Sequence, residues 1–570
     1  MDDSRVHFEV YVRKIPGAPW TLDLATENRA NALFTANELM KEGRVAAAKV
    51  TKETLNEETR EYAAVIILKL GAADTAAKSK PQADAQPLCV TPQDLYTVHA
   101  RERIGRVLEA FLERNYATPF ELLHRPDLVE NLEASGTELQ HAIQKIAIPE
   151  AHARDMSIHE MIRSFHTLIE RTVEKLMKDH HRGALVDLKT ETFAAAADRL
   201  AADPERGYLL GAGVAGAIAD ANSWGEKVTR LLDLADEWPE RGRGRELALY
   251  TLQQPLAEIL EAKPGIGEIL GNGRDLGENL AAMTRLAAFD TVEKLIRVEK
   301  SVAKVMPELS PIAMRLAVWL ENDTFQDTRA AIGRRILREL TGQRRLRPGD
   351  AAGEIAILRA LGMALTASAG KLLPLEEVQA AFIARSRTLV TGDFVEAYLG
   401  QGMTSKQEVE ALVWLTENTI GAANKRQAGG WLKAIITSLR FEKEVATSSE
   451  SPAAKLASLA GLQRSVARCG LVAEDFHPLQ EKLGEIGGEI EAQGKVTQGV
   501  ARAKAPIVHR LTVLLKLAVG ESAPLGPAAD RARNEALKLI KQDETRTALA
   551  AAPEQVQQVR ALIHAAGLAA

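Results

Sequence analysis

The chain has 570 residues, of which 46% are hydrophobic and only 4% are aromatic, and its formal net charge is −5. This length exceeds what one hydrophobic core usually serves, so we expect two or more domains or an extended array. Ala and Leu fill most apolar positions and both favour helices, so the composition predicts a mainly α fold. The near balance of 72 Lys and Arg with 77 Asp and Glu excludes a global field that would attract nucleic acid or an anionic membrane.

The cysteines and the chain start indicate a cellular location. Cys89 and Cys469 lie too far apart in the sequence for a disulfide framework or a cysteine-rich zinc site, so we expect free thiols in a reducing compartment. The first residues contain neither a basic region nor an apolar run, and no uninterrupted apolar span is long enough to cross a bilayer. The sequence therefore predicts a cytoplasmic protein without a signal peptide or a membrane span.

Residues 1–70 predict a small α+β domain. β-branched and aromatic segments between breakers predict four strands, at residues 8–12, 20–24, 47–51 and 62–70. Thr26 is expected to cap a helix that ends at Gly43, between the second and third strands. A single helix covers one face of such a sheet, so the other face or an edge should meet another domain or chain.

Residues 71–87 predict a linker, because they are polar, contain two prolines and show no periodicity. Residues 88–182 then predict a histidine-rich helical bundle that begins at Thr91 and Pro92, a cap followed by proline at the first helical position. Eight of the twelve histidines fall in this region: His99, His124, His141, His152, His159, His166, His180 and His181.

The stretch 156–183 predicts the best-defined long helix of the chain. Ser157 is placed to cap it through its hydroxyl, and Glu160, three residues on, is placed to return the hydrogen bond. Gly183 is expected to end it, because glycine adopts the left-handed conformation at low cost. One apolar face recurs at spacings of three and four residues through Ile158, Met161, Ile162, Phe165, Ile169, Val173 and Leu176.

Beside that apolar face, His159, Arg163, His166 and Glu170 form one stripe. His166 and Glu170 are four residues apart and could share a metal, so His159, His166 and Glu170 are candidate metal ligands. Such a site needs further ligands from other helices. The preferred interpretation is that these side chains line the boundary between core and solvent, because a motif match without a confirming context is usually a false positive.

Residues 183–570 predict an irregular α-helical array of stacked bundles or an α-solenoid, in which short breakers separate helices of ordinary length. No known repeat signature recurs. The expected helix starts are Ser223 with Glu226, Asp290 with Glu293, Ser310 with Pro311, Thr404 with Gln407, and Ser451 with Pro452. The expected stops are Gly400, Gly421, Gly470 and Gly520.

Gly211, Gly213 and Gly216 match the spacing of a dinucleotide-binding fingerprint. That fingerprint binds a pyrophosphate only where a strand delivers the chain to a helix N-terminus, and the apolar run before Gly211 is very short. Close packing of a helix through small residues is therefore the preferred interpretation.

The most basic segment, residues 329–347, supplies candidate partner-binding residues. Arginine side chains here could clamp a phosphate or an acidic protein surface, although a solvated surface with carboxylate neighbours is the simpler interpretation. The candidates are Arg334, Arg335, Arg338, Arg344, Arg345 and Arg347, and a smaller basic loop carries Arg241, Arg243 and Arg245.

The standard nucleophile, P-loop and zinc signatures are missing, which argues against most enzyme classes. We therefore expect a cytoplasmic interaction scaffold or adaptor that presents helical surfaces to a protein partner. The alternative is a signalling regulator that binds a metal or small ligand in the histidine-rich region. Nucleic acid is not expected as a partner, a homo-oligomer stays open, and the sequence assigns no cofactor.

Overall fold

The computed structural model describes residues 6–14, 20–55, 62–71, 88–237, 244–322, 324–551 and 553–568. Contacts divide the chain into two compact units. The first, here called the sheet unit, is Met1–Val90 together with Glu150–Met156; the second, the helical unit, is Thr91–Pro149 together with Ser157–Ala570. The helices of residues 88–182 and those of residues 183–570 thus share the helical unit.

The sheet unit contains four strands and one helix: β1 (Val6–Arg13), β2 (Thr21–Thr26), α1 (Arg29–Lys41), β3 (Ala47–Leu55) and β4 (Tyr62–Gly71). The strands pair antiparallel in the order β2-β1-β3-β4. Val10 and Val50 lie opposite each other in the register and are fully buried with Ala32 and Ala36 of α1. One helix therefore covers one face of the sheet, as alternation along a strand requires.

The start of α1 differs from the sequence expectation. Asn28, not Thr26, caps this helix, since the side-chain oxygen of Asn28 accepts hydrogen bonds from the backbone of Ala30 and Asn31. Thr26 instead ends β2. The expected turn at residues 16–17, the loop at 56–60 and all of the expected linker after Gly71 up to residue 87 lie outside the described residues.

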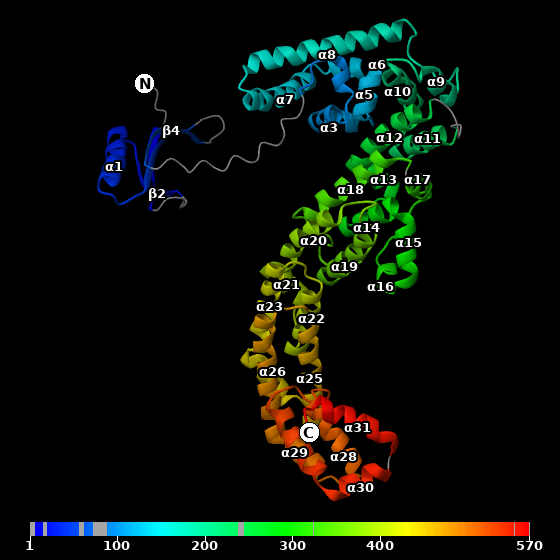
Figure 1. Ribbon diagram of the computed structural model, residues 1–570. Helices are drawn as coiled ribbons and strands as arrows, with labels where there is room; N and C mark the ends of the chain where they lie inside the picture. Colours follow the sequence, from blue (N-terminus) through cyan, green and yellow to red (C-terminus); the bar gives the residue numbers. More distant parts are fainter. Residues whose placement is uncertain are drawn as a thin grey trace. The chain divides into compact units, whose positions relative to one another are not determined.

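The helical unit begins with ten helices: α2 (Pro92–Leu95), α3 (Val98–Val107), α4 (Glu109–Arg114), α5 (Pro119–His124), α6 (Pro126–Ala134), α7 (Glu138–Arg154), α8 (Ile158–His181), α9 (Phe193–Leu200), α10 (Arg206–Ala217) and α11 (Trp224–Asp236). Figure 1 shows α8 as the long helix beside α5 and α6. It ends as expected, with Gly183 at a φ of +62°. Ser157 is its N-cap residue, but the expected side-chain hydrogen bond is not formed there.

The array continues with α12 (Arg245–Glu261), α13 (Lys263–Leu270), α14 (Leu276–Ala287), α15 (Phe289–Val298), α16 (Lys300–Ala303), α17 (Pro311–Glu321), α18 (Gln326–Thr341), α19 (Ala351–Ala367), α20 (Leu375–Leu389), α21 (Gly392–Leu399), α22 (Ser405–Glu417) and α23 (Ala422–Ile436). It closes with α24 (Leu439–Thr447), α25 (Pro452–Arg468), α26 (Ala473–Gly494), α27 (Val496–Ala501), α28 (Ile507–Ala518), α29 (Pro527–Ile540), α30 (Asp543–Ala551) and α31 (Pro553–Ala565). A mainly α fold with a small N-terminal sheet is thereby confirmed. None of the described helices is long and apolar enough to cross a membrane.

Many helices of the array pack against the next helix in the sequence, as α22 does on α23, α25 on α26 and α28 on α29, whereas α12 packs on the more distant α18 (Figure 1). Their buried side chains join one core that extends from Phe120 to Ala566. Most of the expected helix starts are confirmed, including the capping box of Thr404 and Gln407. Asp290 was wrong as a cap, because α15 already begins at Phe289.

Candidate functional site

A pocket of about 200 Å³ lies within the helical unit, among α2, α5, α8, α10 and α12. Its wall combines aromatic, polar and charged side chains, among them Tyr96, His124, Lys175, Glu205, Tyr208 and Gln254. Three of these helices, α2, α5 and α8, belong to the histidine-rich region, and α10 and α12 belong to the array. The pocket thus forms where the two parts of this unit meet.

His124 is positioned by the short helix α5. Thr118 and Glu121 form a capping box at its start, with the Thr118 hydroxyl 3.2 Å from the Glu121 backbone nitrogen, and Pro119 occupies the first helical position. This start fixes where the last residue, His124, falls. The imidazole is 4% exposed and donates from Nδ1 to the carbonyl oxygen of Phe120 at 2.7 Å.

The other ring nitrogen of His124, Nε2, has no hydrogen-bond partner among the described residues. A carbonyl oxygen can only accept, so Nδ1 carries the proton and Nε2 presents its lone pair. Burial lowers the pKa of His124 to about 4, so the ring is neutral at physiological pH. A buried polar atom without a partner costs stability.

Glycines in α10 leave space for the packing of the His124 ring and of Val186. A Cβ built on Gly211 would lie 2.5 Å from His124 Nε2, and one on Gly213 would lie 2.7 Å from a methyl carbon of Val186. Both glycines are buried within the helix, so no strand delivers the chain to a helix start here. The interpretation of Gly211, Gly213 and Gly216 as packing residues is confirmed for the first two, whereas Gly216 faces open space.

Three aromatic rings gather at the pocket. The ring centroid of Tyr96 lies 5.1 Å from that of His124 and 5.6 Å from that of Tyr208, while those of His124 and Tyr208 are 6.0 Å apart. The Tyr208 hydroxyl donates to Asp179 at 3.2 Å. Burial, with the nearby carboxylates, raises the pKa of both tyrosines, so they stay phenols.

Lys175 lies at the edge of the same rings. Its ammonium is 3.1 Å from a carboxylate oxygen of Asp179 and 2.8 Å from one of Glu205. It also lies 4.5 Å from the ring centroid of Tyr208, a cation–π distance. One ammonium is therefore shared by two carboxylates and one aromatic face.

Two walls of the pocket are tied to one buried carboxylate, Glu258 of α12. Arg101 donates to Glu258 at 2.6 Å and also to the backbone carbonyl of Tyr96. The backbone nitrogen of Phe120 donates to the other Glu258 oxygen at 2.7 Å, and the carbonyl of Phe120 holds His124. Burial raises the pKa of Glu258, opposed by Arg101. Through this chain of contacts α12 sets the position of both Tyr96 and His124.

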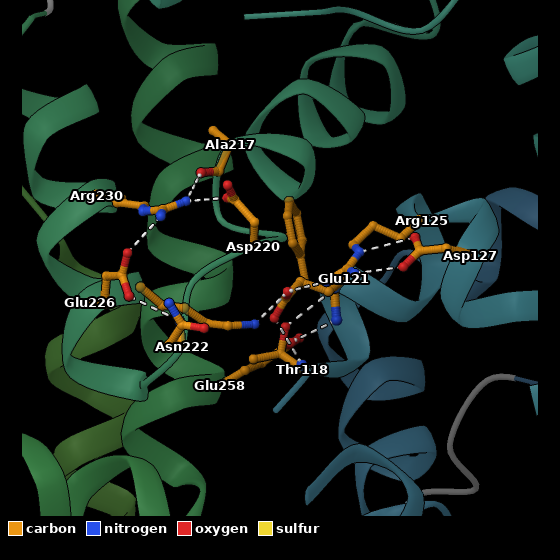
Figure 2. A network of polar contacts seen from close by, with 12 residues as sticks. Thr118, Glu121, Arg125, Asp127, Ala217, Asp220, Asn222, Glu226, Arg230 and Glu258 are labelled. Atoms are coloured by element: carbon orange, nitrogen blue, oxygen red, sulfur yellow. Dashed lines mark hydrogen bonds and ion pairs between the residues drawn. The ribbon is translucent and has the colours of Figure 1, made fainter. Parts of the chain in front are cut away.

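A second buried ion pair attaches α5 to α11 (Figure 2). Lys227 and Glu121 are 1% and 0% exposed, and the Lys227 ammonium is 2.6 Å from a Glu121 oxygen. Arg125 lies 3.1 Å from the same carboxylate. Figure 2 also shows Arg230 of α11 between Asp220 and Glu226, a separate group of ion pairs nearer the surface.

The predicted metal ligands lie elsewhere on α8. His159 and Glu170 are exposed and His166 is half-buried. In the part of the chain that the structure describes, no three His, Cys, Asp or Glu side chains are grouped so as to hold a metal. Metal binding by His159, His166 and Glu170 stays a prediction, and it would need ligands from outside the described residues.

The six candidate arginines, here called the arginine cluster, divide into two groups. Arg335 is buried and donates to the carbonyls of Leu260 and Glu261 at 2.8 Å. Arg345 pairs with Glu354 at 2.5 Å, and Arg347 pairs with Asp275 and Glu278 at 3.0 and 2.8 Å. Arg334, Arg338 and Arg344 are exposed, so only these three present a surface to a partner.

Two arginines of the smaller basic loop, Arg241 and Arg243, lie outside the described residues, and Arg245 is the first residue of α12.

The sequence analysis did not single out Tyr96, His124, Lys175, Tyr208 or Glu258. The local signal for α5 was present in Thr118, Pro119 and Glu121, but no local pattern places α5 against Gly211 or α12. Comparison with known protein families, with curated proteins and with solved structures finds no match for this chain.

Proposed function

We propose that this protein is a regulator that binds a small ligand in the histidine-rich part of its helical unit. The observation that carries the proposal is a pocket of about 200 Å³ whose wall includes His124, a buried imidazole with an unpartnered Nε2. Pockets that combine aromatic walls with a few convergent polar groups are the usual sites of small ligands.

A ligand in this pocket would act on the helices beyond it. Tyr96 and His124 both connect to Glu258, and α12, which carries Glu258, packs against α18 in the array. A ligand that prefers one placement of these walls shifts the populations of the helix arrangements by its difference in affinity. This coupling supports a regulatory role rather than simple storage.

The proposal is tested by equilibrium dialysis of the purified full-length protein against a metabolite extract of its native cells, followed by mass spectrometry. The blocking variant is Gly207→Leu, because Gly207 lines the pocket and a Cβ there meets nothing within 4 Å. The matched control is Gly216→Leu on the same helix, where a Cβ also meets open space outside the pocket. A metabolite enriched by the wild type and the control, but not by Gly207→Leu, is the expected result. Equal enrichment by all three proteins, or none by any, would overturn the proposal.

The second candidate function is a scaffold that presents helical surfaces to a protein partner. Exposed Arg338 and Arg344 favour it, because neighbouring guanidinium groups suit an acidic protein surface. The double variant Arg338→Glu/Arg344→Glu should lose a stoichiometric partner that purifies with the tagged full-length protein. The control Lys541→Glu/Arg546→Glu reverses two exposed charges elsewhere and should keep it. A protein that purifies alone would contradict the scaffold.

A cytoplasmic location is part of both proposals. Cys469 is buried, where desolvation raises the pKa of its thiol. A chain with only two cysteines, far apart in the sequence, is in keeping with a reducing compartment.

A further inference from the structure

We propose that the ligand of the His124 pocket is a small organic cation, a primary amine or a quaternary ammonium, held against the faces of Tyr96 and Tyr208 and balanced by Glu205. The inference rests on the proposed function, because it names the ligand class of the same pocket. It follows from the charge, the aromatic faces and the size of the site.

The charge of the wall disfavours an anion. Among the residues that the structure describes, Lys175 is the one cationic side chain that lines the pocket, and its ammonium already contacts carboxylate oxygens of Asp179 and Glu205 at 3.1 and 2.8 Å. The imidazole of His124 is neutral at physiological pH. Two carboxylates against one ammonium leave the Lys175 cluster with a net negative charge, which a cationic ligand would neutralise.

The aromatic faces favour a cation. Aromatic rings carry a negative face, and rings that converge on one point are how proteins recognise ammonium groups. Tyr96 and Tyr208 converge with a centroid distance of 5.6 Å, and Tyr250 adds a third phenol to the lining. The Lys175 ammonium, 4.5 Å from the Tyr208 centroid, shows that this ring already accepts a cation from within the chain.

The size of the pocket limits the ligand. His124 lines it as a neutral ring, and its unpartnered Nε2 is itself buried, where a Cβ on Gly211 would lie 2.5 Å away. The pocket volume of about 200 Å³ is of the order of the cavity of ~150 Å³ that accommodates benzene, so the ligand is small. An amino alcohol or its methylated ammonium meets all three requirements.

The test compares choline with its neutral carbon isostere, 3,3-dimethylbutan-1-ol, on the full-length protein. The two probes share shape and hydroxyl and differ in charge, so the ratio of their dissociation constants isolates the cation. Saturation-transfer NMR and calorimetry should show choline binding about tenfold more tightly than the isostere to the wild type and to Gly216→Leu. Binding of both probes should be lost in Gly207→Leu, which fills the pocket.

Glu205→Gln supplies the electrostatic control, because it removes one negative charge and keeps the side-chain shape. The variant should weaken choline binding severalfold and leave the binding of the isostere unchanged. Ethanolamine, tetramethylammonium, acetate and phosphate complete the panel. Equal or tighter binding of the isostere, binding of an anion, or no binding of any cation in the panel would overturn the inference.

Failure of the cation proposal can be distinguished from failure of the proposed function. If a neutral or anionic metabolite is retained by the wild type but not by Gly207→Leu in the dialysis experiment, the pocket binds a ligand and only the cation is wrong. If the extract yields nothing and the panel yields nothing, both proposals fall.

Discussion

The pocket around His124 and the arginine cluster both bury ionisable side chains, but they satisfy them differently. At the arginine cluster, the buried guanidinium of Arg335 donates to backbone carbonyls at the end of α12. Arg385 of α20 does the same on α18, where it donates to the carbonyls of Leu340, Arg344 and Glu339, each at 2.7 Å. At the pocket, the His124 ring forms part of the wall, and its buried Nε2 has no hydrogen-bond partner among the described residues.

The difference separates a structural use of buried charge from a binding site. Carbonyls at a helix C-terminus lack partners within the helix, so a buried arginine that reaches them satisfies both sides and leaves nothing for a ligand. The His124 ring nitrogen is instead left unpaired, in the wall of a pocket that has room for a ligand. Four sets of variants test this contrast.

The largest effect is expected for loss of the buried Lys227 charge, which pairs α11 with α5. Lys227→Met leaves Glu121, which is fully buried, with Arg125 as its remaining cation. Removing one partner of a buried ion pair costs about 3–5 kcal/mol, so the free energy of unfolding should fall by that amount in urea denaturation followed by circular dichroism. The double variant Glu121→Gln/Lys227→Met should lose less than the two single variants together. A loss below about 1 kcal/mol for Lys227→Met would show that the pair contributes no more than a surface pair.

His124 should make the stability of the protein depend on pH. Its pKa is about 4 in the folded chain against an ordinary value of 6.5, so between these values the unfolded chain binds a proton that the folded chain does not. Stability from this group is therefore complete above pH 6.5 and is lost as the pH falls to 4, by about 3 kcal/mol in total. The check is the difference in unfolding free energy between the wild type and His124→Phe from pH 7 to pH 4. Parallel curves for the two proteins would contradict the assignment.

Within the arginine cluster, burial should decide the effect. Arg335→Met removes the donor that caps the carbonyls of α12 and should destabilise the protein by about 2 kcal/mol. Arg338→Met, on the same helix but exposed, should change the unfolding free energy by less than about 0.5 kcal/mol. Thermal and urea unfolding of the two variants side by side measure this contrast. Similar losses for both would mean that the cluster acts as one electrostatic unit.

The smallest effects distinguish two glycines of α10. Gly211→Ala places a Cβ 2.5 Å from His124 Nε2 and should destabilise the protein by about 1–2 kcal/mol. Gly216→Ala meets open space and should stabilise it by about 0.5–1 kcal/mol, because alanine is the better helix former. The melting temperatures of the two variants should therefore shift in opposite directions. Adding His124→Ala to Gly211→Ala should recover part of the loss; if it does not, the ring is not what the glycine accommodates.

Local signals in the sequence were enough to predict the fold class and the ends of many helices. The capping box of Thr404 and Gln407, the Ser451–Pro452 start and the Gly183 stop depend on neighbouring residues alone, and the structure confirms them. The expected helix starts at Thr26 and at Asp290 with Glu293 were wrong. Another residue one or two positions away could begin the helix equally well, and packing selected it.

The sequence by itself determined that this chain is mainly helical, because apolar periodicity, caps and glycine stops are encoded within a few residues of each other. The tertiary structure decided where a ligand could bind. Arg101 meets Glu258 across 157 positions and Lys227 meets Glu121 across 106, and no periodicity encodes such pairings. His124 became a candidate only once α5, α10 and α12 packed together, because burial and the absence of a partner are properties of the packed chain.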